Sequence, residues 1–80
     1  MDPRTDWRER IVADPKVLVG KPVIKGTRIS VELVLDLLGR GYTMEDVLRQ
    51  YEHLRLEDLH ACLAFAADVV AMERTIRRPA

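Results

Sequence analysis

The sequence predicts a mainly α fold, in which a short N-terminal β-ribbon is followed by a three-helix, helix-turn-helix-like bundle. Three observations lead to this prediction. Short apolar runs bounded by glycine and proline fill residues 9–29. After Ser30 the hydrophobic period changes from two to about 3.6 residues. A short helical segment is then followed closely by a longer one, which is the pattern of a helix-turn-helix.

We expect a single domain, because 80 residues are too few for two hydrophobic cores. The polar segment 1–8 is expected to be a flexible arm, which Trp7 could anchor by covering apolar surface. The domain would then cover residues 9–76, and residues 77–80 would form a tail. A core of this size is modest, so we expect dimerisation or a partner protein to add stability.

The ribbon is expected over residues 9–29. Four short apolar runs indicate strands: 11–12, 17–19, 23–24 and 27–29. Turns are indicated at Asp14-Pro15 and Gly20-Lys21-Pro22, and Gly26 can take the positive φ that a tight hairpin turn needs. Because such short strands are unstable alone, we expect helices behind them and a second chain at their edges.

Three helices are expected over residues 30–76, and the first two have clear start signals. Ser30 is a good N-cap for the first helix, whose end is marked by Gly39. Thr43 caps a second, short helix that runs from Met44 to about Tyr51, with Asp46 in a capping-box-like position.

The third helix is expected from about Leu56 to Arg74. Glu57 and Asp58 at its start and arginines at its end both agree with the helix dipole. Its inward face is predicted from residues that recur at helical spacing: Leu59, Leu63, Ala66, Ala67 and Val70.

Several kinds of chemistry are not expected. Cys62 is the only cysteine and lies in an apolar run, so we interpret it as a small core residue. His53 and His60 lack further ligands, so no metal and no cofactor are expected. The carboxylates of the helical region lie at helix starts, where capping explains them, so we do not expect an enzyme. The apolar stretch 61–67 is too short to span a membrane, and the charged N-terminus lacks a signal core, so the cytoplasm is expected.

The run from Ile11 to Ile29, which contains Gly-Lys-Pro-Val-Ile-Lys-Gly-Thr-Arg-Ile, is distinctive. Together with residues 41–48 it resembles a bacterial family known as domain of unknown function 433, and the resemblance spans roughly residues 9–72. It implies a homeodomain-like trihelical fold and the role of an antitoxin paired with a PIN-type nuclease toxin. The chain departs from the family pattern at Glu52, where proline is usual, and at Arg55, where a capping Thr or Ser is usual.

DNA binding is weighed from the distribution of charge. Residues 1–30 carry seven basic and four acidic residues, whereas residues 31–60 carry three and seven. A DNA-reading third helix would present Glu57 and Asp58 to the phosphates, which is unfavourable. The ribbon offers better candidates for DNA contact: Arg10, Lys21, Lys25 and Arg28.

Each of these ribbon cations has an alternative role. Lysines on edge strands prevent aggregation between sheets. Arg28 could clamp Asp36 or another carboxylate instead of a phosphate.

The C-terminal end carries a protein-partner hypothesis. PIN-type nucleases hold metal with clustered carboxylates, so arginines from an antitoxin tail could neutralise them. Arg74, Arg77 and Arg78 are the candidate toxin-binding residues, and the alternative is a solvated tail that favours the helix dipole.

The sequence therefore leads us to expect a dimeric antitoxin that binds a PIN-type ribonuclease toxin, and it leaves open whether the protein also binds its own operator DNA. In that hypothesis the ribbon supplies the dimer contacts, while the third helix and the tail bind the toxin. Two alternatives stay open: a DNA-binding transcriptional regulator without a toxin, and a structural adaptor.

Overall fold

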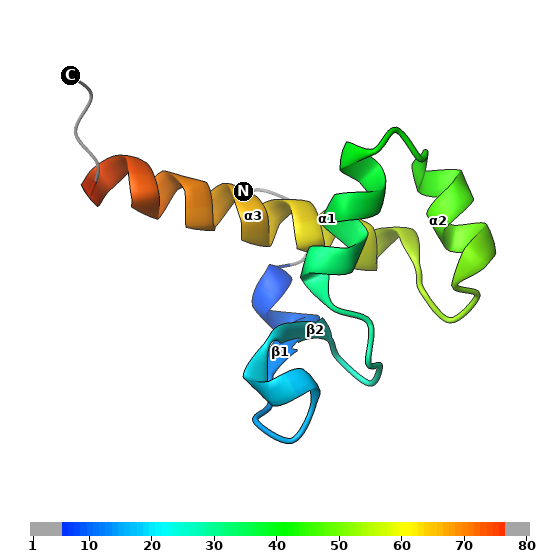
Figure 1. Ribbon diagram of the computed structural model, residues 1–80, viewed down its shortest axis with the longest axis horizontal. Coiled ribbons are helices and arrows are strands. Elements are labelled where there is room, and N and C mark those ends of the chain that lie inside the picture. The colour runs from blue at the N-terminus through cyan, green and yellow to red at the C-terminus, as the bar shows by residue number, and fades with distance from the viewer. Residues whose placement is uncertain (1–5, 77–80) are drawn as a thin grey trace.

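A computed structural model describes residues 6–76 of the chain and the side chains of residues 6–72. It confirms a mainly α fold with a short antiparallel ribbon before three helices (Figure 1). The elements follow one another as the 3-10 helix η1 (Trp7–Glu9), strand β1 (Ile11–Ala13), the 3-10 turn η2 (Leu18–Gly20), strand β2 (Pro22–Ile24), and helices α1 (Val31–Gly39), α2 (Met44–Gln50) and α3 (Leu56–Ile76).

The ribbon consists of β1 and β2, which pair antiparallel with Ile11 opposite Ile24 and Val12 opposite Val23. Ile11, Val23 and Ile24 are buried, so one face of the ribbon packs on the helices. Gly26 lies at a φ of 80° in the turn after β2, where Thr27 donates its backbone N–H to the carbonyl of Ile24. The positive φ expected at Gly26 is therefore confirmed.

Two expected strands are not formed. Residues 17–19 belong to a coiled connection, because the side chain of Asp14 accepts a hydrogen bond from the Lys16 N–H and its carbonyl accepts one from Val17. Leu18 and Val19 then take positive φ values of 48° and 55°. Residues 27–29 form a bend that returns the chain to α1, and only an isolated bridge between Val23 and Ser30 extends the pairing.

The two shorter helices begin at the expected caps. The Ser30 hydroxyl accepts a hydrogen bond from the Leu33 N–H at 3.0 Å, which starts α1. At α2, Thr43 and Asp46 form a complete capping box: the Thr43 hydroxyl accepts from the Asp46 N–H, and the Asp46 carboxylate accepts from the Thr43 N–H. This hydrogen bond from the Thr43 N–H lowers the pKa of Asp46.

The hydrophobic core lies where the first half of α3 meets α1, α2 and the ribbon. Cys62 has no exposed surface, which confirms it as a core residue. Burial, with a smaller contribution from the charge of Asp58, raises the pKa of the Cys62 thiol to about 12. The buried members of the core are Ile11, Ile24, Val31, Val34, Val47, Leu54, Leu59, Ala61 and Cys62.

The second half of α3 extends beyond the rest of the chain, as the orange and red turns in Figure 1 show. The inward face predicted for this helix is therefore only partly right. Leu59 is fully buried, but Leu63 is 40% exposed and Val70 is 55% exposed. Cys62 is buried and Phe65 is half-buried on either side of Leu63, so Leu63 and Val70 are exposed because they lie on the side of α3 that faces away from the core.

None of the described helices is both long and apolar enough to cross a bilayer.

Candidate functional site

The protruding part of α3 carries four of the eight exposed large hydrophobic residues of the described chain. We call residues 63–76 the outer half of α3. Between Ala61 and Met72 the sequence contains a single charged residue, Asp68. Val69 is 42% exposed and Met72 is 64% exposed. A surface helix normally presents a polar face to water, whereas this part of α3 presents mainly apolar side chains.

The outer half of α3 carries two apolar stripes on different sides. The core-side stripe consists of Cys62, Phe65, Val69 and Met72, which continue the buried face of α3 at alternating spacings of three and four residues. The far stripe consists of Leu63, Ala67, Val70 and Arg74, at spacings of four, three and four. At roughly 100° per residue the two stripes lie about 150° apart around the helix, so two different partners could use them.

An open groove lies beside the core-side stripe, at the point where α3 leaves the body of the protein. Its volume is about 820 Å³. Its apolar lining comes from Phe65 of α3, from β2 and from α1, and α1 also supplies the charged residues of its lining. The lining residues are Pro22, Val31, Glu32, Leu35, Asp36, Gly39, Arg40 and Phe65.

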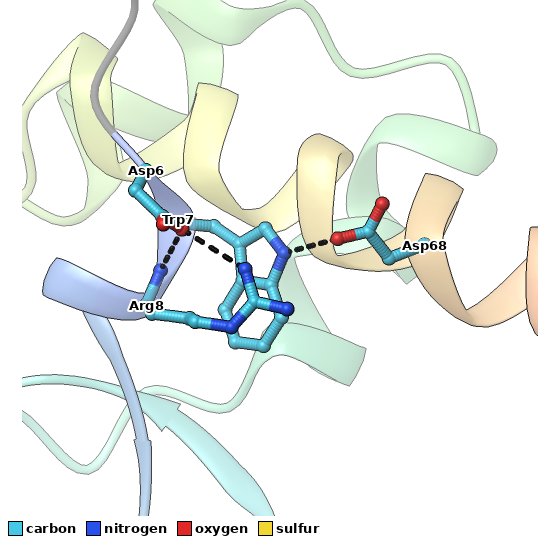
Figure 2. Close-up of polar contacts among 4 residues, drawn as sticks. All are labelled: Asp6, Trp7, Arg8 and Asp68. Carbon is cyan, nitrogen blue, oxygen red and sulfur yellow. Dashed lines mark hydrogen bonds and ion pairs between the residues drawn. The ribbon is translucent and has the colours of Figure 1, made fainter.

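Trp7 fastens the N-terminal segment to the start of the outer half (Figure 2). Its ring packs edge-on against Phe65, with ring centroids 4.9 Å apart, and its Nε1 donates to the Asp68 carboxylate at 2.6 Å. The Arg8 guanidinium lies 4.5 Å from the centre of the same ring. The Asp6 carboxylate accepts the Arg8 N–H, which lowers the pKa of Asp6. Trp7 therefore packs on α3 through its ring and its indole N–H, whereas Asp6 and Arg8 are exposed.

Arg10 is hydrogen-bonded to the first turn of α3. Its Nη1 donates to Asp58 Oδ1 at 3.0 Å, and Asp58 Oδ2 accepts the Arg55 N–H at 2.9 Å. Asp58 thus supplies the capping hydrogen bond that the Arg55 side chain cannot make. The Arg10 side chain is partly buried, and its Nε is buried without a hydrogen-bond partner. This geometry separates Arg10 from the other cations proposed for DNA contact.

Those other ribbon cations are exposed. Lys21 makes an exposed ion pair of 3.2 Å with Glu32. Lys25 and Arg28 flank the Gly26 turn, and their side chains make no ion pair with any described residue. The clamp considered between Arg28 and Asp36 is not formed.

Asp36 is instead paired with Arg40 at 2.8 Å, one turn along α1. This contact is local and needs nothing from the ribbon.

The three toxin-binding candidates are less fully described. Arg74 is part of helix α3, but its side chain lies outside the described part of the structure. Arg77 and Arg78 lie outside the described residues. Sequence reasoning missed the groove and the exposure of the outer half, although the scarcity of charge between residues 61 and 72 was a usable signal for the latter.

Comparison with known proteins gives a family and little about activity. The family model described as protein of unknown function (DUF433) matches residues 11–66. A segment of 24 residues is 75% identical to an uncharacterized protein of Archaeoglobus fulgidus, and it covers 30% of this chain and 67% of that protein. No solved structure matches the chain.

Proposed function

Because the chain belongs to the protein family of unknown function DUF433, its activity must be argued from its surface, and we propose that it is an antitoxin-like protein that binds and neutralises a PIN-type ribonuclease toxin. The observation that carries this proposal is the exposed apolar outer half of α3, which ends in a basic segment. A small domain without a metal-binding cluster among its described residues is suited to binding a partner.

The far stripe is the proposed toxin-binding surface. Leu63 and Val70 are exposed apolar residues one above the other on the helix, and Arg74 continues the same line. Such a helix can lay its apolar side chains in a hydrophobic groove of a partner, with anchors at the spacing seen here. The arginine would then be delivered at the end of the apolar contact.

Arginine suits the proposed target chemically. A PIN-type nuclease holds its metal with clustered carboxylates, and the guanidinium can bind a carboxylate through two parallel hydrogen bonds. Arg77 and Arg78 follow in the sequence and add positive charge to the C-terminal segment. Occupation of the carboxylates by these groups would compete with metal binding and stop RNA cleavage.

Contact with operator DNA is a second proposed activity, and a specific observation favours it. Lys25 and Arg28 are exposed on either side of the Gly26 turn and carry no ion pair within the described structure, so both are free to meet phosphates. Affinity from such contacts falls as salt rises. A regulator that binds only DNA is the alternative function, and both activities place the protein in the cytoplasm.

Co-expression of the chain with the tagged product of the neighbouring reading frame, which we expect to be the nuclease, tests the toxin proposal. The wild-type chain should co-purify with the tagged nuclease and relieve growth arrest. Val70→Glu and Arg74→Glu should lose both effects, while Val19→Glu, which changes a valine that is 93% exposed outside the stripes, should keep them. Full neutralisation by both far-stripe variants would overturn the proposed surface. Salt-sensitive promoter binding in the absence of any nuclease complex would favour the alternative function.

A further inference from the structure

The core-side stripe has the pattern of a helix that packs against another helix. Cys62 and Phe65 lie on the core face of α3, and Val69 and Met72 continue that face after the body of the protein has ended. Ile76 follows at the same spacing in the sequence. The alternation of three and four residues from 62 to 76 is the spacing of the apolar seam in a coiled coil. Val69 and Met72, in the half of this seam that lies beyond Phe65, are exposed among the residues that the structure describes.

We propose that a second copy of the chain covers this seam. The two α3 helices lie antiparallel about a two-fold axis near Val69, and the end of each helix enters the groove of the other copy. With this centre, each Met72 faces Ala66 of the other copy, next to Phe65 at the groove. This interface goes beyond toxin binding, because it uses the opposite side of α3 from the far stripe.

Self-complementarity favours a second copy over another partner. A two-fold interface requires the same surface to carry both a projection and the hollow that receives it. Here the projection, Val69 and Met72, and the hollow beside Phe65 lie on one helix face. At about 1.5 Å per residue, Phe65 and Met72 are about 10 Å apart along the axis, so both contacts form at once in an antiparallel pair.

The groove also selects the antiparallel orientation. In an antiparallel pair, Met72 of each copy meets the groove beside Phe65 of the other copy, so each projection fills a hollow. A parallel pair would place Met72 opposite Met72 and groove opposite groove, so both hollows would stay open.

The proposed dimer also needs the groove to reach a sufficient contact area. The seam from residue 62 to 76 is only about two heptads, which is short for a stable coiled coil on its own. Packing of the helix end against the α1 wall, at Leu35 and Gly39, adds the further contact. The far stripe stays outward in this dimer, so each dimer would present two copies of the proposed toxin-binding surface.

Two neighbouring valines give a matched test by size-exclusion chromatography with light scattering on the full chain. The wild type should be a dimer of the 9.2 kDa chain. Val69→Glu should be a monomer, with at least a tenfold weaker dimer, and Val70→Glu should stay dimeric. Circular dichroism would establish that both variants keep their helices. A monomeric wild type, or a Val69→Glu variant as dimeric as Val70→Glu, would overturn the proposal.

Disulfide trapping provides a second test that does not depend on tolerance of a buried charge. Because the two-fold axis passes near residue 69, Val69→Cys should form a covalent dimer under mild oxidation, and Val70→Cys should not. Cys62 is fully buried and should not interfere. Equal cross-linking of both variants, or none of Val69→Cys, would contradict the antiparallel arrangement. Toxin binding lost only by Val70→Glu and dimerisation lost only by Val69→Glu would separate this proposal from the toxin-binding proposal.

Discussion

Replacement of Asp58 tests how the N-terminal ribbon is fixed to α3. Asp58 is 7% exposed, and its carboxylate accepts hydrogen bonds from the Arg10 guanidinium at 3.0 Å and from the Arg55 N–H at 2.9 Å. Asp58→Ala removes both contacts. The start of α3 then has no cap. The Arg10 guanidinium loses its carboxylate partner, and its Nε is already buried without a hydrogen-bond partner.

The expected loss in the free energy of unfolding is about 3 kcal/mol. Loss of a capping hydrogen bond costs about 1 kcal/mol. Loss of one partner of a fully buried ion pair costs about 3–5 kcal/mol, but the Arg10 side chain is 30% exposed, and we discount this contribution to about 2 kcal/mol for solvent screening. Asp58→Asn keeps an oxygen for the Arg55 N–H, so it should cost about 1 kcal/mol less than Asp58→Ala. For a domain of this size the alanine variant should lower Tm by roughly 15 °C.

Urea unfolding followed by the circular dichroism of the helices measures these differences, because Trp7 fluorescence would report the separate undocking of η1. All variants are compared at one chain concentration, because dimerisation makes apparent stability depend on concentration. Arg10→Met and the double variant complete a double-mutant cycle, in which we expect a coupling energy of about 1–2 kcal/mol. A loss below about 1 kcal/mol for Asp58→Ala, or additive effects in the cycle, would refute the assigned role of this contact.

Three further predictions concern separate features. Val19→Gly should raise the free energy of unfolding by about 1 kcal/mol, because glycine takes a φ of 55° without strain and the valine buries almost nothing; an unchanged urea midpoint would contradict this. The pKa of Asp46 is lowered in the fold, so its ionised form stabilises the protein above the ordinary carboxyl range, and this stabilisation is lost as pH falls below about 4. Asp46→Asn should therefore show a weaker acid dependence of Tm than the wild type. With its pKa raised to about 12, Cys62 should resist iodoacetamide at about pH 8.5 and react once urea unfolds the chain. Its neutral form stabilises the fold below the ordinary thiol pKa of 9.0, and that contribution is lost as pH rises toward 12.

The helices were predictable because capping residues close in the sequence determine where they begin. Ser30 and Thr43 cap α1 and α2 where the sequence indicated, and α3 begins at the expected Leu56. The run 17–19 was wrong as a strand because apolar character alone does not distinguish a strand from a turn. The hydrogen bonds of Asp14 and the positive φ of Gly20 decide the matter locally.

The candidate site was less predictable, because it depends on contacts between segments that are far apart in the sequence, and a local sequence pattern does not reveal such contacts. Helical spacing predicted an inward face through Leu63 and Val70, but α3 is apolar on more than one side, and spacing alone does not say which side meets the core. The engagement of Arg10 by Asp58 joins residues 48 apart, so the sequence could only place Arg10 among the exposed cations. The groove likewise needs the angle between α1 and α3.

The contact between Trp7 and α3 has a consequence for the order of folding. It joins residues 61 apart in the sequence, whereas β1, β2 and the caps of α1 and α2 form between near neighbours. Closure of a long loop costs conformational entropy before any contact repays it, so docking of η1 comes late in folding. The same step is the first to reverse under mild denaturant, which makes η1 and the outer turns of α3 a separate cooperative unit that exchanges its amide hydrogens before the core opens.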